Sequence, residues 1–236
     1  MTVTIHRVPD DILTPEEIEP WRVVSVAVAV DLIPEEQLDI GIRPINPPGR
    51  QPKLFGRAVT AQCVPPDFGA VLHALDRIAK GDVLVIAADG KDEAAMIGEI
   101  LGGHLRNLGG AGLICDGAIR DVATLAGWDD VSVFTRAVNP RGPTGADQGA
   151  VNLPVEISGR LVSPGDLIIG DDDGLVALSP SSVRSRLADA EARLGVEASW
   201  VKALASGQSM AETFGLPRAE VIASSRVGPL ADVRGD

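Results

Sequence analysis

The chain has no tyrosine, and aromatic residues make up only 3% of its 236 positions. Its core must therefore be built from Val, Leu, Ile and Ala, and few rings are present on which nucleic-acid bases could stack. The two cysteines, Cys63 and Cys115, are too few for a disulfide framework and have no Cys or His neighbours at zinc-ligand spacing. We expect both to be buried free thiols in a protein of the reducing cytoplasm.

Long apolar runs and an excess of basic residues are also missing. The longest run, from Val23 to Val30, is interrupted by Ser25 and is too short to span a bilayer. The N-terminus has no apolar segment of the kind that secretory signals carry. Lys and Arg number 21 against 33 Asp and Glu, which gives a net charge of −12. Because such a protein repels a phosphate backbone, we expect neither a nucleic-acid nor a membrane partner.

From residue 54 onward, the sequence alternates between strand and helix patterns. Continuous apolar runs predict strands at 54–64, 82–88, 112–115 and 131–138. Helical spacing predicts helices at 68–79, within 93–107 and at 120–126. After residue 150, short apolar segments separated by Gly, Pro and Asp are typical of a β-meander. This alternation favours an α/β core.

The two ends of the chain differ from this central part. Residues 1–53 form an acidic arm, a helix expected to run from Pro15 to Leu32, and a proline-rich loop at 41–52. Residues 181–236 contain a charged helix to about position 206, and the last twenty residues are expected to form a weakly ordered tail. We therefore divide the chain into an N-terminal arm (1–53), a catalytic α/β domain (54–180) and a C-terminal helix with its tail (181–236).

The segment Ala111–Asp121, AGLICDGAIRD, holds the most informative chemistry. A buried strand is predicted to end at Cys115, with a turn at Asp116-Gly117 and Arg120-Asp121 at the start of the next helix. Ligands of open α/β sheets gather at the carboxyl ends of strands. An Arg fork suits a carboxylate or keto oxygen, and an Asp is a hard ligand for Mg²⁺. The alternative is a surface ion pair whose Asp caps a helix.

A second candidate segment is Gly98-Glu99-Ile100-Leu101. A glycine that leads into a helix leaves backbone N–H groups free to bind an anion, although an ordinary glycine inside a helix is the alternative. Twenty residues separate Glu99 from Arg120. That spacing permits a shared site but does not demand one.

Together these residues resemble the signature of a known family. An acidic residue, twenty residues and then Arg-Asp are the pattern of the RraA-like family, which includes 4-hydroxy-4-methyl-2-oxoglutarate / 4-carboxy-4-hydroxy-2-oxoadipate aldolases and the regulator of ribonuclease E activity A. The run Asp116-Gly117-x-x-Arg120-Asp121 and the segment 162–174, VSPGDLIIGDDDG, match as well. The resemblance covers residues 54–180 and is specific to the family rather than to a substrate.

The resemblance implies a three-layer β/β/α swivelling-type fold that assembles as homotrimers or homohexamers with active sites between subunits. Asp121 would be the protein ligand of Mg²⁺ or Mn²⁺, and Glu99 would hold metal-bound water. Arg120 would bind the oxygen of a pyruvyl group, and the backbone amides of Gly98, Glu99, Ile100 and Leu101 would hold its carboxylate. A neighbouring subunit would contribute an acidic residue from its C-terminal helix, for which Glu197 is the best candidate.

The implied activity is metal-dependent retro-aldol cleavage of a 4-hydroxy-2-oxo diacid that releases pyruvate, with oxaloacetate decarboxylation as a side activity. Two alternatives remain. One is a non-catalytic regulator that binds a ribonuclease or helicase, and the other is a lyase or isomerase acting on a related hydroxy acid. A pure binding module has no reason to assemble Glu99, Arg120 and Asp121 together, which favours the aldolase.

Overall fold

The computed structural model describes residues 2–8 and 11–220. The chain divides into two compact units, residues 1–193 and 194–236. Most of the predicted C-terminal tail, residues 221–236, lies outside the described residues.

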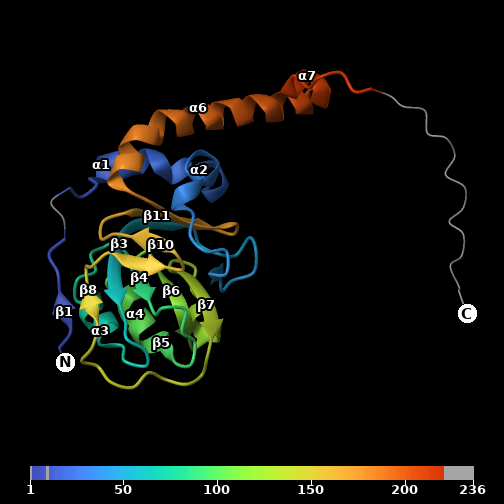
Figure 1. Ribbon diagram of the computed structural model, residues 1–236. Coiled ribbons are helices and arrows are strands. Elements are labelled where there is room, and N and C mark those ends of the chain that lie inside the picture. The colour runs from blue at the N-terminus through green and yellow to red at the C-terminus, as the bar shows by residue number, and fades with distance from the viewer. Residues whose placement is uncertain (1, 9–10, 221–236) are drawn as a thin grey trace, which may run out of the picture. The chain divides into compact units, whose positions relative to one another are not determined.

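A ten-stranded sheet forms the centre of the first unit (Figure 1), and its main path has the order β1-β8-β3-β4-β6-β7-β2. Strands β3, β4, β6 and β7 are parallel to one another, as the alternation of strands and helices predicts. Off this path, β5 pairs with β6, and the β11–β12 hairpin joins through β3. The strands of the sheet are β1 (Thr4–Ile5), β2 (Arg43–Pro44), β3 (Leu54–Gln62), β4 (Val83–Ala87), β5 (Ala95–Ile97), β6 (Gly112–Ile119), β7 (Ser132–Val138), β8 (Ala150–Val151), β11 (Leu167–Asp171) and β12 (Gly174–Leu178).

A separate two-stranded sheet and several helices complete the described fold. The small sheet pairs β9 (Val155–Ile157) with β10 (Arg160–Val162) in antiparallel fashion. The helices are α1 (Pro15–Ile18), α2 (Val26–Leu32), α3 (Gly69–Leu75), α4 (Glu99–Asn107), α5 (Val122–Leu125), α6 (Pro180–Ala205) and α7 (Met210–Phe214), with 3₁₀ helices η1 (Glu19–Val23) and η2 (Pro34–Glu36).

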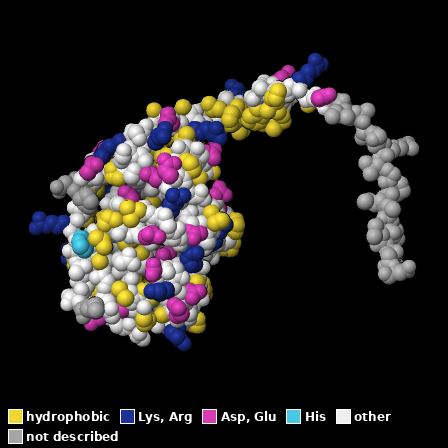
Figure 2. Space-filling model, viewed as in Figure 1, with side chains coloured by type: hydrophobic (Ala, Val, Ile, Leu, Met, Phe, Trp, Pro, Cys, Tyr) yellow, Lys and Arg dark blue, Asp and Glu magenta, His cyan; other side chains and the backbone are white. Residues whose placement is uncertain are grey.

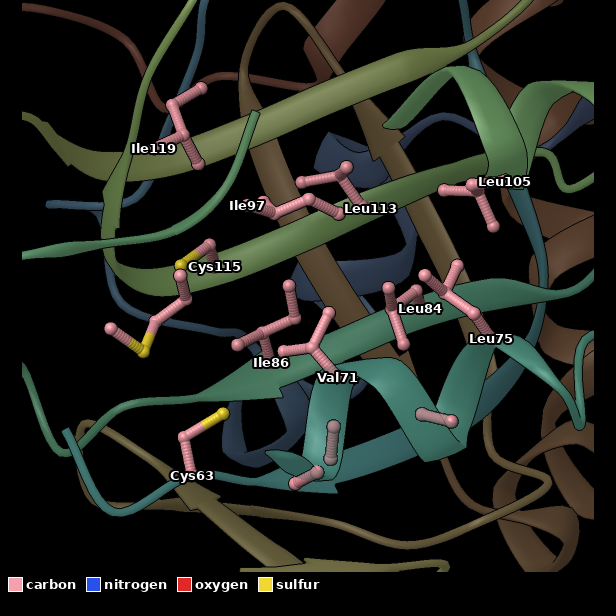
Figure 3. Packing of buried hydrophobic residues seen from close by; sticks show 14 of the residues in the cluster. Cys63, Val71, Leu75, Leu84, Ile86, Ile97, Leu105, Leu113, Cys115 and Ile119 are labelled. Atoms are coloured by element: carbon pink, nitrogen blue, oxygen red, sulfur yellow. The ribbon is translucent and has the colours of Figure 1, made fainter. Parts of the chain in front are cut away.

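Alternating side chains of the parallel strands build two separate cores. On one face of the sheet, Leu84 and Ile86 of β4 pack with residues of α3, α4 and α5 (Figure 3). On the other face, Val83 and Val85 pack with residues of β9, β10, β11 and β12. Since successive strand residues point to opposite faces, the continuous apolar run of β4 serves both cores. The result is a helix layer, a central sheet and a second layer of strands, which confirms the predicted α/β, three-layer fold.

The single helix predicted from Pro15 to Leu32 is wrong. The structure has α1, then η1, then α2. Pro20 has no amide hydrogen to continue an α-helix, and the hydroxyl of Ser25 accepts a hydrogen bond from the backbone N–H of Val28, so that a new helix begins. Between them, buried Trp21 donates from Nε1 to the carbonyl of Val183 at 3.1 Å, which ties the N-terminal arm to the start of α6.

The predicted end of a strand at Cys115, with a turn at Asp116-Gly117, is also wrong. Strand β6 continues to Ile119, with an irregular register between Cys115 and Ala118. Neighbours on both sides hold the extended chain, because β7 pairs along its length and β5 pairs with its last residues. The segment predicted as helical at 93–107 contains this short strand β5 before α4 begins.

In its described part, up to residue 220, the second unit contains the end of α6 and the short helix α7. A capping box between Ser209 and Glu212 begins α7. The rings of Trp200 and Phe214 lie 5.0 Å apart between centroids. Hydrophobic side chains gather on this helical segment, whereas on the visible face of the first unit acidic and basic side chains are interspersed (Figure 2). No helix in the described ranges has the length and apolar character that crossing a membrane requires.

Candidate active site

The predicted site residues are brought together by the parallel pairing of β5 with β6. Ile97 lies opposite Ile119, so both strands end at the same edge of the sheet. The backbone N–H of Arg120 donates to the carbonyl of Ile97 at 3.0 Å. The chain then enters α4 on one side and α5 on the other. Residues that are more than twenty positions apart in sequence therefore become neighbours.

Asp121 connects the starts of these two helices. It is the N-terminal flanking residue of α5, in a left-handed conformation with φ of 59°. Its Oδ2 accepts a hydrogen bond from the backbone N–H of Glu99 at 3.0 Å and lies 3.5 Å from Nε of Arg120. Among the described residues, none donates a hydrogen bond to its Oδ1. A left-handed backbone outside glycine is unusual, and such residues are concentrated at functional sites.

Glu99 is held by the same pair of helices. Its Oε2 accepts a hydrogen bond from the hydroxyl of Thr124 at 2.8 Å. Thr124 lies one helical turn after Asp121, so it faces the same edge. The side chain of Glu99 is thereby anchored to α5, whose first turn follows Asp121, and both Glu99 and Asp121 are exposed to solvent.

Two glycines allow the chain to approach Arg120 closely. A Cβ on Gly98 would lie 2.4 Å from Oδ2 of Asp121 and 2.7 Å from Cγ of Arg120. A Cβ on Gly142 would lie 2.7 Å from Nη1 of Arg120. Within the described ranges, the guanidinium donates no hydrogen bond and has Asp121 as its one ion-pair partner. Its fork of N–H groups is therefore available to a ligand.

The N-terminus of α4 supplies backbone donors next to this guanidinium. The helix has nine residues, and the N–H of Gly102 donates to the carbonyl of Gly98 at 2.9 Å. The N–H groups of Ile100 and Leu101 precede that bond and have no acceptor in the helix. Together with the helix dipole, they form a site that favours an anion.

A buried carboxylate fixes the loop that carries Gly142. Asp67 accepts hydrogen bonds from the backbone N–H groups of Gly69, Asp147 and Gln148, at 2.8, 3.1 and 3.2 Å. Burial opposes ionisation of this group, but the three backbone donors outweigh it and hold the pKa of Asp67 below its usual range. The loop is thus fastened to the start of α3.

A second buried carboxylate supports the irregular part of β6. Asp116 accepts hydrogen bonds from the N–H groups of Ala88 and Gly90, and its carbonyl accepts one from Nε of Arg136 at 2.9 Å. Burial raises the pKa of the Asp116 carboxyl group, against the effect of its two backbone donors. These contacts hold the last residues of β6, which lead directly into Arg120.

A cavity of about 340 Å³ opens beside the guanidinium of Arg120. It lies between α3 and α4, which occupy the same side of the sheet (Figure 1). Gly98 and Gly142 contribute to its wall together with apolar side chains. A ligand held by Arg120 and the amides of α4 could extend into this cavity.

The donor set suits a hard divalent cation. No group of three or more His, Cys, Asp or Glu residues that could hold a metal occurs within residues 2–8 and 11–220. Mg²⁺, however, usually keeps several waters and binds proteins through one or two carboxylates. Asp121, with its unpartnered Oδ1, and the adjacent Glu99 provide such a pair. The residues present therefore fit Mg²⁺ or Mn²⁺ bound mainly through water.

The structure thus places most of the predicted site residues at one edge of the sheet: Gly98, Glu99, Ile100, Leu101, Arg120 and Asp121. Glu197 is a half-buried residue of α6 in the second unit, and its role stays a prediction. The sequence reasoning missed Thr124 and Gly142. Thr124 could have been found from its spacing of three residues after Asp121, whereas no local signal marks Gly142.

Fold and site together define an α/β protein with an Arg-Asp pair and a helix N-terminus at the carboxyl edge of a parallel sheet. The family model described as "RraA-like: Aldolase/RraA" matches residues 27–177. The chain belongs to the RraA-like family. It is 33% identical over 159 residues to a Halalkalibacterium halodurans protein named "Putative 4-hydroxy-4-methyl-2-oxoglutarate aldolase", which covers 64% of this chain and 74% of the relative.

Solved structures share the fold. The RraAS2 protein of Streptomyces coelicolor, described as an unusual member of the RNase ES inhibitor RraA family, is 28% identical with a TM-score of 0.68, covering 78% of this chain and 96% of its own. An uncharacterized protein from Pseudomonas syringae pv. tomato is 23% identical with a TM-score of 0.75, covering 86% and 98% respectively, and shows the fold alone.

Proposed function

We propose that this protein is a divalent-metal-dependent lyase that cleaves a 4-hydroxy-2-oxo acid by a retro-aldol reaction and releases pyruvate. The observation that carries the proposal is the cluster of Glu99, Arg120 and Asp121 around the N-terminus of α4. The similarity to a protein named as an aldolase supports it at the level of the family.

In this proposal the 2-oxo acid end of the substrate binds between α4 and Arg120. Its carboxylate accepts hydrogen bonds from the N–H groups of Ile100 and Leu101, which have no acceptor in the helix. The guanidinium of Arg120 donates to the 2-oxo oxygen, and Gly142 leaves room for this guanidinium. The positive charge that a net −12 protein needs to bind an anion is thus supplied locally.

The reaction breaks the bond between C3 and C4. A base removes the proton of the 4-hydroxyl group, the C4–O bond becomes a carbonyl, and the electron pair of the C3–C4 bond moves onto the pyruvyl half. Arg120 stabilises the negative charge that develops on the 2-oxo oxygen. C3 then takes up a proton, which gives pyruvate and an aldehyde or ketone. Glu99, positioned by Thr124, moves the proton through water.

Asp121 and Glu99 are the residues that would hold Mg²⁺ or Mn²⁺. When bound there, the ion would supply Lewis-acid stabilisation of the negative charge that develops on the substrate. The same stabilisation of negative charge would serve the decarboxylation of oxaloacetate, which is the expected side activity. Assembly as a homotrimer or homohexamer, with Glu197 reaching a neighbouring site, belongs to the proposal as well.

A regulatory function is the second candidate. The Streptomyces coelicolor relative and a Thermus protein titled an RNA-processing inhibitor, 28% identical with a TM-score of 0.58, carry names of that kind. Nothing in regulation by surface contact requires a guanidinium paired with Asp121 next to a Glu99 carboxylate that Thr124 anchors. We therefore place catalysis first.

The test measures pyruvate release with lactate dehydrogenase as the coupling enzyme, using oxaloacetate and 4-hydroxy-4-methyl-2-oxoglutarate with Mg²⁺, with Mn²⁺ and with EDTA. We expect activity that needs the metal and that falls at least about 100-fold in Asp121→Ala and in Arg120→Ala. Asp173→Ala and Arg160→Ala, at exposed positions, remove the same charges elsewhere and should leave it unchanged. Full activity in EDTA or in Asp121→Ala would refute the mechanism, and no turnover of any oxo acid would favour the regulator.

A further inference from the structure

The cavity beside Arg120 is lined, apart from Arg120 itself, by apolar residues and glycines. Its walls carry the side chains of Phe68 and Leu72, Met96 and Ile97 of β5, Leu101 of α4, and Pro143. Arg120 is the one charged residue among those that line it. Ile100, also in the wall, is 74% exposed although it is a large aliphatic residue. A cavity with one cation at its edge and hydrocarbon elsewhere is suited to a ligand that is charged at one end only.

From this lining we infer that the substrate of this protein has an apolar substituent on C4, so that it is a 4-hydroxy-2-oxo monoacid with an aliphatic tail rather than a diacid. The inference rests on the proposed function, which assigns the 2-oxo acid end to Arg120 and the amides of α4. A second carboxylate pressed against Leu72 or Phe68 would lose its water without gaining a partner, which is strongly unfavourable. An alkyl group at the same place gains from burial.

A neighbouring cavity has the charged lining that a diacid substrate would require. It measures about 420 Å³, is lined by Lys91 and Arg141 as well as by Glu93, and meets the apolar cavity at Gly142. Its two cations would suit a second carboxylate. Arg120, however, lines the apolar cavity and does not line this one. The part of a substrate that extends from Arg120 therefore contacts apolar side chains before it reaches Lys91 or Arg141.

The anchoring contacts also fix which way the substrate extends. The free N–H groups of α4 belong to Ile100 and Leu101, and the side chains of these residues line the apolar cavity. The loop that closes the opposite side carries Gly142 and Pro143, and Asp67 fastens it to the start of α3. The cavity is thus a built part of the site, with walls from α3, β5, α4 and this loop.

The test compares substrates matched in length. The intact protein with Mg²⁺ is given 4-hydroxy-2-oxohexanoate, which yields pyruvate and propanal, or 4-hydroxy-2-oxoadipate, which yields pyruvate and 3-oxopropanoate. We expect kcat/KM to be at least about tenfold higher for the monoacid. It should rise further by about fourfold for each methylene added up to 4-hydroxy-2-oxooctanoate. An equal or higher value for the diacid would overturn the inference.

A variant with a positive charge in the wall of the apolar cavity tests the same inference from the side of the protein. Leu72→Arg should shift the kcat/KM ratio at least about tenfold toward the diacid, whereas Leu161→Arg, on β10 and 67% exposed, should leave the ratio unchanged. If Leu72→Arg does not fold, calorimetry on the unmodified protein with 2-oxohexanoate and 2-oxoadipate decides the question. Tighter binding of 2-oxohexanoate supports the apolar tail, and tighter binding of 2-oxoadipate, or of neither, overturns it.

Oxaloacetate tests the proposed lyase activity separately from the inferred apolar substituent, because its decarboxylation requires no substituent on C4. Turnover of oxaloacetate together with preference for the diacid overturns the apolar tail and keeps the proposed lyase. If the protein turns over none of these compounds, the proposed lyase activity is refuted. The inferred apolar substituent on C4 of the substrate is then refuted as well.

Discussion

Replacing Gly98 by alanine tests whether the close approach of this residue, which lies between β5 and α4, to the Arg-Asp pair matters for function. The new Cβ would lie 2.4 Å from Oδ2 of Asp121, and ordinary contacts begin at 3.4 Å, so the carboxylate has to move by about 1 Å. The same Cβ would lie 2.7 Å from Cγ of Arg120. Both functional side chains are therefore displaced by one methyl group.

The expected cost follows from that displacement. A shift of about 1 Å in a catalytic group lowers rates by about 100-fold, and we expect a loss of this size in kcat/KM for pyruvate release from Gly98→Ala. The affinity for Mn²⁺ should fall in the same variant, because Oδ2 of Asp121 also leaves the N–H of Glu99. The protein should still fold, since Asp121 and Arg120 are partly open to solvent and have room to move.

Gly103→Ala is the matched control. Gly103 lies in the same helix, α4, and no heavy atom lies within 4 Å of the Cβ that alanine would add. Activity should be unchanged, and the free energy of unfolding should rise by about 0.5–1 kcal/mol, because alanine favours a helix over glycine. Wild-type kcat/KM and Mn²⁺ affinity in Gly98→Ala would refute the geometry of the site.

Two further predictions concern the core. Burial raises the pKa of Asp166 from 3.8 to about 6, so the folded protein holds this proton to higher pH than the unfolded chain, and stability falls as pH rises across that interval. Asp166→Asn should add at most about 3 kcal/mol to the free energy of unfolding in urea at pH 8 and nothing below pH 4, and equal effects at both would contradict this origin. Burial also raises the pKa of the Cys63 and Cys115 thiols, the latter to about 12. Neither should react with a thiol reagent at pH 8 until the protein is unfolded, and labelling of the native protein would show that the core opens.

The core strands were predictable because strands that are buried on both faces consist of consecutive apolar residues, which can be recognised in the sequence. The run around Val83–Ala87 is apolar at every position, since both faces of β4 are covered. The two cysteines are buried, as their lack of partners predicts. Errors arose where tertiary contacts outweigh local signals. Asp116-Gly117 has the composition of a turn, but the residues on either side of it pair with neighbouring strands, and Arg136 and Thr135 donate to its two carbonyls, so the strand continues.

The candidate site was predictable in part for a similar reason. Arg120 and Asp121 follow a buried strand, which is a local signal. Their meeting with Glu99 depends on the three-residue strand β5, which is too short to be recognised by periodicity. Gly142 joins the site from a loop whose position depends on Asp67, and no pattern near residue 142 reports that contact.

The parallel pairing of β5 with β6 has a consequence for how this protein could diverge. The groups proposed for chemistry lie on one continuous stretch, from Gly98 to Thr124. The opposite walls of the apolar cavity, with Leu72 and Pro143, belong to segments before and after it. Mutations that change the fit of a substrate tail therefore need not alter the segment that performs the reaction. Homologues that descend from one gene could therefore acquire different substrate specificities through substitutions in α3 or at residues 142–143. Residues 98–124, which carry the groups proposed for the chemistry, would stay unchanged.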